Sequence, residues 1–144
     1  MADWNKRFIN LSEHISNWSK DKSVGVCAII TSPDNRILSI GYNGFPIGCD
    51  DTIEERHQRP NKYEWTEHAE RNAIYNAARS GVNINNSTMY LKWFPCTDCA
   101  RAIIQSGIKK LVCEKPDFSD KRWGPKFKIA HEMLNECNIT IEYI

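Results

Sequence analysis

The feature that most constrains the fold is an alternation of strand-like and helix-like segments along the whole chain. Apolar residues recur at helical spacing over residues 3–18, 66–81, 95–107 and 125–137. Strand-like runs cover residues 24–30, 37–42, 88–94, 110–113 and 139–144. This order is typical of an α/β protein with a largely parallel sheet that helices cover on both faces.

The first two strand-like runs flank Pro33-Asp34-Asn35, which is a turn signal and predicts a hairpin. The hairpin makes the predicted sheet mixed rather than wholly parallel. We therefore expect a three-layer α/β/α sandwich with a five-stranded mixed sheet. The length of 144 residues, without linker or repeat, predicts a single domain over residues 1–144.

Composition excludes several classes of protein. The formal net charge is +1, from 19 basic and 18 acidic residues, which argues against a nucleic-acid partner. No apolar stretch approaches the roughly 20 residues that span a bilayer, and the N-terminus lacks the apolar core of a signal peptide. We expect a cytoplasmic protein with no membrane partner. Its six cysteines should stay reduced there, so paired cysteines favour metal binding over disulfides.

Two short motifs carry the chemistry: His68-Ala69-Glu70 and Pro95-Cys96-Thr97-Asp98-Cys99. Cys96 and Cys99 place two sulfur atoms within reach of one ion, and His68 supplies a nitrogen ligand, which is a donor set that zinc favours. Three protein ligands leave a fourth position open, as in catalytic sites. Redox pairs and structural zinc sites also use Cys-x-x-Cys, but the histidine and the helix starts favour a catalytic site.

Glu70 lies two residues from His68 and is free to move protons between a zinc-activated water and a substrate. One helix and one strand separate the two motifs, so both helix starts should meet at one edge of the sheet. The combined pattern resembles that of zinc-dependent nucleobase deaminases.

The stretch from Gly41 to Gly48 narrows the choice among the families of zinc-dependent deaminases. Together with residues 68–74, 89–99 and 105–109, it closely resembles deoxycytidylate deaminases over about residues 22–113. The resemblance implies a cytidine deaminase-like fold and hydrolysis of dCMP to dUMP and ammonia, which supplies dUMP for thymidylate synthesis. It also implies that zinc held by His68, Cys96 and Cys99 activates water, and that Glu70 carries the proton to N3 of cytosine and then to the leaving ammonia.

Substrate contacts are implied by the same resemblance. Asn43 is expected to bind the sugar, and Ala69, Trp93 and Phe94 to lie near the base or sugar. Turn chemistry at Asn43 and plain core packing of the aromatic residues are the alternatives. For the phosphate the candidate is Lys22, with three further cations as alternatives: Lys121, Arg122 and Lys126. Each of these cations would otherwise be an exposed surface charge.

Regulation is also implied by the resemblance, because similar proteins are often homo-hexamers that dCTP activates and dTTP inhibits. The effectors would bind near the loop of residues 43–51, with Gly44 and Arg79 as the allosteric candidates. The alternative is that Arg79 is a helix-end cation favoured by the helix dipole. Cys49 and His57 are suitable ligand types for a second zinc ion, but two ligands are too few.

Two rival hypotheses remain at this point. One is a zinc deaminase for free cytosine, cytidine, guanine or adenosine in transfer RNA, and the near-zero charge disfavours the RNA substrate. The other is a non-catalytic zinc scaffold, against which Glu70 argues because a scaffold needs no proton shuttle. Sequence alone leaves the preference for mono- or triphosphate, and for ribose or deoxyribose, undecided.

Overall fold

The computed structural model describes residues 1–144 and confirms the predicted order of helices and strands. Its elements are α1 (Trp4–Ser16), β1 (Cys27–Thr31), β2 (Ile37–Tyr42), η1 (Glu54–His57), α2 (Lys62–Trp65), α3 (Ala69–Ser80), β3 (Thr88–Leu91), α4 (Thr97–Gln105), β4 (Lys110–Cys113), α5 (Gly124–Glu136) and β5 (Thr140–Tyr143).

The strands form one five-stranded mixed sheet in the order β2-β1-β3-β4-β5, as predicted. β1 pairs antiparallel with both β2 and β3, whereas β3, β4 and β5 run parallel to one another. The sheet is therefore less parallel than the alternation of strands and helices suggested. The parallel part is built by α4 and α5, which connect β3 to β4 and β4 to β5.

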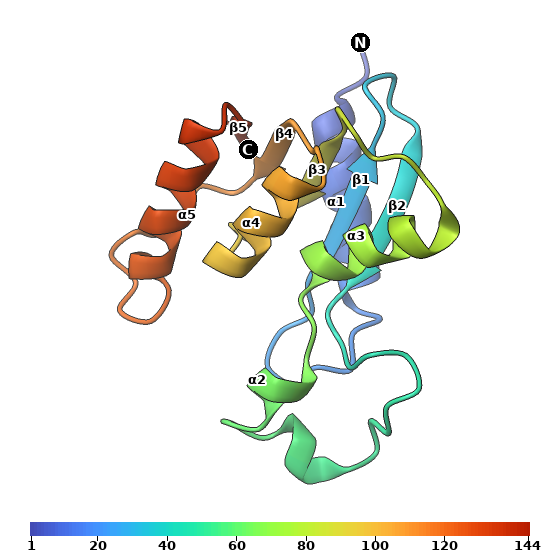
Figure 1. The fold of residues 1–144 in the computed structure, drawn as a ribbon, viewed down its shortest axis with the longest axis vertical. Coiled ribbons are helices and arrows are strands. Elements are labelled where there is room, and N and C mark those ends of the chain that lie inside the picture. Colours follow the sequence, from blue (N-terminus) through green and yellow to red (C-terminus); the bar gives the residue numbers. More distant parts are fainter.

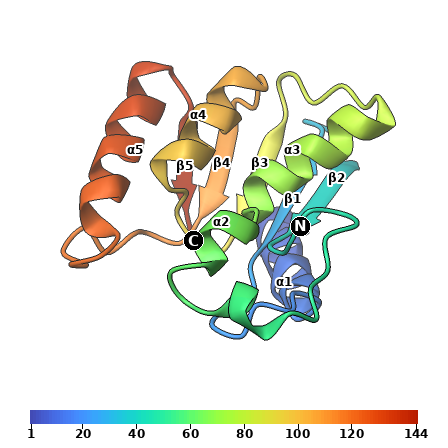
Figure 2. The ribbon, with the colours of Figure 1, turned by 60° about the horizontal axis from the view of Figure 1, so that its bottom comes forward.

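Helices cover both faces of the sheet and create two apolar cores. α3, α4 and α5 lie side by side on one face, and α1 lies on the other (Figure 2). Strand β1 is buried along its whole length, since Ala28 and Ile30 belong to the larger core and Ile29 to the core under α1. A strand that is covered on both faces needs apolar residues at successive positions, which explains the continuous apolar run in the sequence of β1.

α3 is held unusually close to β2. A Cβ atom on Gly41 would lie 2.1 Å from the backbone nitrogen of Ala73, so only glycine permits this approach. Asn72 and Asn76 of α3 donate side-chain hydrogen bonds to backbone carbonyls of β2, at 2.9 and 2.8 Å. These contacts fix the position of the helix whose N-terminus carries His68 and Glu70.

Three predicted strands are shorter in the structure, and the last of them, β5, loses one residue at each end. The first begins at Cys27 rather than at residue 24, because the backbone around Val24 and Val26 bonds to the side chain of Asn43 instead of a neighbouring strand. Strand β3 ends at Leu91, so Trp93 and Phe94 lie beyond it, just before α4.

Residues 44–66 form an excursion that extends away from the sheet and contains η1 and α2 (Figure 1). The sequence predicted an irregular loop here and gave no sign of these short helices. Lys62 is the only buried residue of the excursion. At its base, Gly44 and Glu67 exchange backbone hydrogen bonds of 3.1 and 2.8 Å, which close the excursion into a loop.

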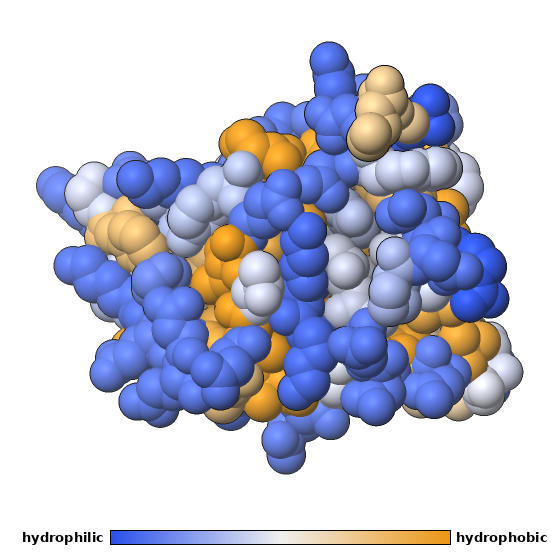
Figure 3. All heavy atoms as spheres, turned by 90° about the horizontal axis from the view of Figure 1, so that it is seen from above, coloured by the Kyte–Doolittle hydropathy of each residue, from blue (hydrophilic) through white to orange (hydrophobic).

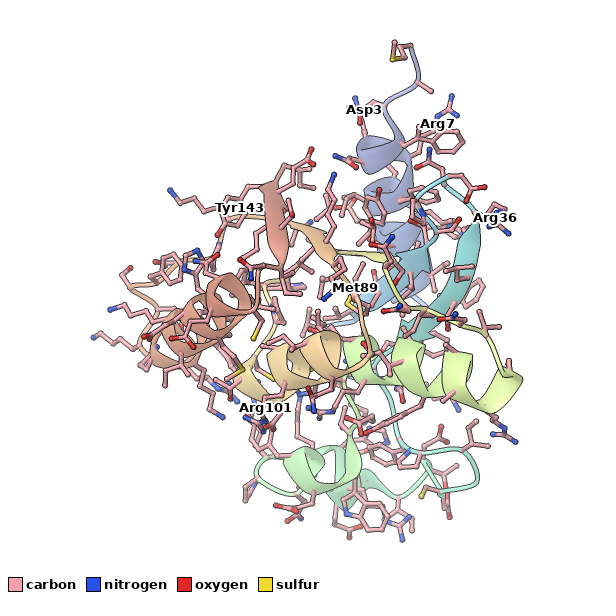
Figure 4. The ribbon with its side chains drawn as sticks, turned by 45° about the horizontal axis from the view of Figure 1, so that its top comes forward. Asp3, Arg7, Arg36, Met89, Arg101 and Tyr143 are labelled. Carbon is pink, nitrogen blue, oxygen red and sulfur yellow. The ribbon has the colours of Figure 1, made fainter.

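The outside of the molecule contrasts with its centre. Met89 of β3 lies in the middle of the structure and is fully buried, whereas Arg7 and Arg36 lie at the periphery (Figure 4). Apolar residues on one end of the molecule form separate areas broken by hydrophilic residues (Figure 3). None of the helices has the length and apolar character that crossing a bilayer demands.

Candidate active site

A cluster of three metal-type ligands lies where α3 and α4 begin. His68 is the N-cap residue of α3 and Cys96 that of α4, and neither side chain caps its own helix. Both are therefore free to face each other. His68 Nδ1 lies 3.6 Å from Cys96 Sγ and 3.5 Å from Cys99 Sγ. It is the one group of three or more metal-type side chains in the protein.

The spacing of these atoms fits zinc. A tetrahedral ion with bonds of about 2.0 Å to nitrogen and 2.3 Å to sulfur holds those two ligand atoms about 3.5 Å apart. The observed distances of 3.5 and 3.6 Å agree with this value before any ion is placed. All three ligand atoms lie within 4.8 Å of one another, and a set of one nitrogen and two sulfur donors leaves a fourth position for water or substrate.

The two thiols are not equivalent. A hydrogen bond from the Cys99 thiol lowers the pKa of Cys96 to about 4, and the bond to His68 adds to the effect. The same bond raises the pKa of Cys99, because its proton is held between the two sulfur atoms. Zinc binds thiolates, so metal binding displaces the proton that lies between the two sulfur atoms.

Glu70 follows the first ligand by two residues and is buried at the first turn of α3, with 5% of its surface exposed. Burial raises the pKa of this carboxyl group, although the neighbouring His68 works in the other direction. A carboxyl group whose pKa is raised toward neutrality is suited to both accept and release a proton.

Arg71 connects the two helices beside the ligands. Its guanidinium donates to the Glu67 carboxylate at 2.6 Å and to Cys99 Sγ at 3.7 Å. Glu67 also accepts a hydrogen bond from the His68 backbone N–H at 3.0 Å. The start of α3 and the last cysteine ligand on α4 are therefore held in one network of polar contacts.

A cavity of about 230 Å³ opens directly above this cluster. His68, Glu70 and Cys96 form part of its floor, together with Ala69. Its remaining walls come from five regions of the chain: the segment before β1, the residue after β2, the end of the excursion, the residues between β3 and α4, and the residues around the start of α5. A partly apolar cavity with a few convergent polar groups is the usual form of a small-molecule site.

Asn43, Ala69, Trp93 and Phe94, the candidates for contact with sugar or base, all line the cavity. Trp93 is half exposed, whereas Phe94 is buried against Phe127. Asn43 uses its amide to bind the backbone of Val24 and Val26, at 2.9 and 2.8 Å. It thus shapes the cavity wall, and one amide hydrogen and one oxygen lone pair remain for a ligand.

The candidate cations for binding the phosphate fall into two groups, those that line the cavity and those that do not. Lys22 does not line the cavity, because its ammonium pairs with Glu54 at 2.5 Å on the surface. Of the alternatives, Arg122 lines the cavity, and Lys121 and Lys126 do not. Arg59 and Lys62 also line it and were missed by the sequence analysis, since they lie in the excursion, where no periodicity marked them.

The regulatory candidates lie elsewhere. Gly44 borders a second cavity of about 190 Å³, which also has Trp18, Tyr42, Phe45 and Lys20 in its walls. Arg79 is exposed near the end of α3 and lines neither cavity. Cys49 joins no metal-type cluster, and His57 bonds to the Asp51 carbonyl at 2.6 Å, so these two residues are not brought together as metal ligands.

The α/β sandwich, the His-Cys-Cys cluster and the adjacent buried glutamate define a zinc-dependent nucleobase deaminase. Residues 2–115 match the family model of the cytidine and deoxycytidylate deaminase zinc-binding region. The chain belongs to this family, and zinc is its cofactor. The resemblance to deoxycytidylate deaminases is thereby confirmed.

Similar proteins cover nearly the whole chain. Human deoxycytidylate deaminase is 37% identical over 143 residues, which span 96% of this chain and 78% of the human protein. A protein of Aliivibrio fischeri named "Uncharacterized deaminase in luxG 3′ region" is 37% identical over 145 residues, or 100% of this chain and 95% of that protein. The crystal structure of dCMP deaminase from cyanophage S-TIM5, in complex with dCMP and dUMP, superposes with a TM-score of 0.77 at 25% identity and covers 96% of this chain and 95% of that chain.

Proposed function

We propose that this protein hydrolyses dCMP to dUMP and ammonia. The observation that carries the proposal is a single cavity with a zinc-type ligand cluster and Glu70 at its floor and two cations without ion-pair partners, Arg59 and Arg122, in its walls. The named activity of the human relative and the dCMP and dUMP bound to the cyanophage protein support the same substrate.

The proposed chemistry depends on the floor of the cavity. His68, Cys96 and Cys99 hold zinc, which when bound acts as a Lewis acid and makes water acidic near neutral pH. Glu70 accepts a proton from the attacking water and delivers it to N3 of cytosine. The water oxygen adds to C4 of cytosine in the same step. Glu70 then takes the second proton of that oxygen and donates it to the 4-amino group, so that the C4–N bond breaks, a C4=O bond forms and ammonia leaves.

Charge on the cavity walls supports a nucleotide rather than a nucleoside. Lys62 is neutralised by Asp21, but Arg59 and Arg122 form no ion pair in the structure. The Arg122 guanidinium lies over the rings of both Tyr63 and Trp123, 5.3 Å from each centroid, which limits the positions it can take. A guanidinium held in this way is suited to a phosphate group.

Regulation by dCTP and dTTP in a homo-hexamer is the second part of the proposal. The second cavity supports it, because Trp18, Tyr42 and Phe45 in its walls suit a base. The Lys20 ammonium in the same wall is paired with Asp51 at 2.7 Å. Gly44 borders this cavity, and Arg79 is an exposed cation available to a neighbouring subunit. We also propose a cytoplasmic location, which the reduced thiol ligands support.

The test is ammonia release by the purified zinc-loaded protein on dCMP, dCTP, CMP, deoxycytidine and cytosine, each with and without added dCTP or dTTP. Preferential turnover of dCMP is the expected result. Preference for deoxycytidine or cytosine would contradict phosphate recognition, and absence of turnover across the panel in zinc-loaded protein would contradict the proposed activity. The oligomeric state is measured on the same sample by light scattering.

A further inference from the structure

The buried ion pair between Lys62 and Asp21 is unusual for its position. Lys62 is the only buried residue of the excursion, and the side chains of Lys62 and Asp21 are 11% and 8% exposed. Burying two charges costs free energy that a surface pair would not, and an apolar pair of the same size would hold two segments together at least as well. The pair is therefore difficult to explain by stability alone.

The side chain of Lys62 makes all of its hydrogen bonds with the segment before β1. Its ammonium donates to both carboxylate oxygens of Asp21, each at 3.2 Å, and to the Ser23 hydroxyl at 3.1 Å. The Asp21 carboxylate thereby neutralises the lysine charge inside the wall. Lys62 consequently holds the cavity wall in place rather than binding a phosphate.

The network continues from the ion pair into the substrate cavity. The Asp21 carboxylate accepts the backbone N–H groups of Ser23 and Val24, at 2.8 and 3.2 Å. The Val24 carbonyl in turn accepts from the Asn43 amide at 2.9 Å. One uninterrupted chain of hydrogen bonds thus joins α2, the segment before β1 and the end of β2, and four of its members line the cavity: Asp21, Val24, Asn43 and Lys62.

We infer that Lys62 is a positioning residue for substrate binding: through Asp21 it sets the distance between the two walls of the cavity and the orientation of Asn43. The inference rests on the proposed function of this cavity. No member of the network belongs to the cluster of His68, Cys96 and Cys99, and Glu70 is not part of it, so the network acts on binding of the nucleotide rather than on proton transfer.

The central experiment replaces Lys62 by Met, which removes the ammonium and keeps an unbranched chain. KM for dCMP should rise about 10-fold or more, with kcat within about 3-fold of the wild type, because the lost interaction orients the walls equally in ground and transition states. The dissociation constant of dUMP should rise in parallel, and bound zinc should remain stoichiometric. Lys62→Arg retains the charge and should restore KM to within about 3-fold of the wild type.

The matched control is Glu54→Gln. It removes the exposed Lys22–Glu54 pair, which joins the same two segments at 60% and 59% side-chain exposure. Exposed pairs contribute about 0–1 kcal/mol, so its KM should stay within about 2-fold of the wild type. An equal rise of KM in the control and in Lys62→Met would overturn the inference, as would a fall of kcat in Lys62→Met with KM unchanged.

A second variant covers the case in which Lys62→Met does not fold. In the double variant Asp21→Asn/Lys62→Met no charge is left unpaired in the wall, and the same rise in KM is expected because α2 is no longer tied to the segment before β1. A double variant with the KM of the wild type would overturn the inference. Turnover by the wild type tests the proposed function separately, and should the wild type prefer another nucleotide, the same comparison is made with that nucleotide.

Discussion

The metal centre and the excursion contribute to the same cavity but are built in opposite ways. Around the metal centre, Ala69, Glu70, Cys99 and Ala100 are at most 5% exposed and lie on helices packed against the sheet. In the excursion one residue of 44–66 is buried, and ion pairs to residues 20–22 are prominent among its contacts with the rest of the molecule.

This difference separates chemistry from recognition. Atoms that take part in bond making need fixed positions, and close-packed interiors supply them. Groups that select the substrate lie on loops that tolerate change, while the scaffold beneath stays constant. Substitutions at the metal centre should therefore lower kcat or the bound zinc content, and substitutions in or beside the excursion should raise KM.

The largest expected effect is loss of a metal ligand. Cys99→Ala removes a buried ligand that is 0% exposed and should abolish both zinc retention and turnover. Zinc content by atomic absorption, together with ammonia release, measures this. Cys113→Ala is the control, since that buried thiol lies in β4 and outside the ligand cluster. Turnover in a zinc-free Cys99→Ala protein would contradict the proposed site.

Replacement of Glu70 by Gln should come next. The amide fills the same space but cannot carry a proton, so kcat should fall about 10²–10⁴-fold. Zinc content and melting temperature should stay at wild-type values, which sets this variant apart from the loss of a ligand. A kcat near that of the wild type would remove Glu70 from the proposed mechanism.

Arg122 tests the recognition side of the comparison. Arg122→Gln should raise KM for dCMP about 10–100-fold, the range expected for a lost hydrogen bond to a charged group, and leave KM for deoxycytidine unchanged. Lys128→Gln, the same change of charge at an exposed site on α5 outside the cavity, serves as the control. A similar rise of KM for both substrates would show that Arg122 does not bind the phosphate group.

The smallest effect concerns stability and pH. Burial alone would raise the pKa of Asp21. The pKa is nevertheless held below its ordinary value of 3.8, because the carboxylate accepts hydrogen bonds from the N–H groups of Ser23 and Val24 and pairs with the Lys62 ammonium. A lowered folded-state pKa means that the ionised carboxylate stabilises the fold above about pH 4, and that this contribution is lost as the pH falls through the folded-state value.

Thermal denaturation of the wild type and of Asp21→Asn measures this contribution. The wild type should melt about 4 °C higher at neutral pH, for a contribution of about 1 kcal/mol, and the difference should disappear in acid. Loss of zinc at low pH affects both proteins and cancels in the comparison. A difference independent of pH would exclude the ion pair as its cause.

The metal centre was predictable because its signal is local. His68 and Glu70 are two residues apart, Cys96 and Cys99 three apart, and the position of both pairs at helix starts follows from periodicity. The order of helices and strands was equally readable, whereas the direction of β1 against β3 depends on how the chain returns after α3, which no local pattern records.

The cavity walls were not predictable in the same way. Lys22 is close in sequence to the cavity wall, yet its side chain turns to Glu54, 32 positions away. Lys62 and Arg59 lie in a segment without periodicity, and their places depend on long-range contacts such as the 41-residue separation between Lys62 and Asp21. Charged side chains at such positions are placed by partners that only the folded chain brings together.

The two cavities share a wall, since Asp21, Asn43, Lys62 and Thr66 border both of them. A molecule in the second cavity therefore touches the same ion pair that shapes the first. By thermodynamic linkage, whatever factor such a molecule imposes on the affinity for substrate, substrate imposes on the affinity for that molecule. A substitution at any of these four residues therefore alters the walls of both cavities at once.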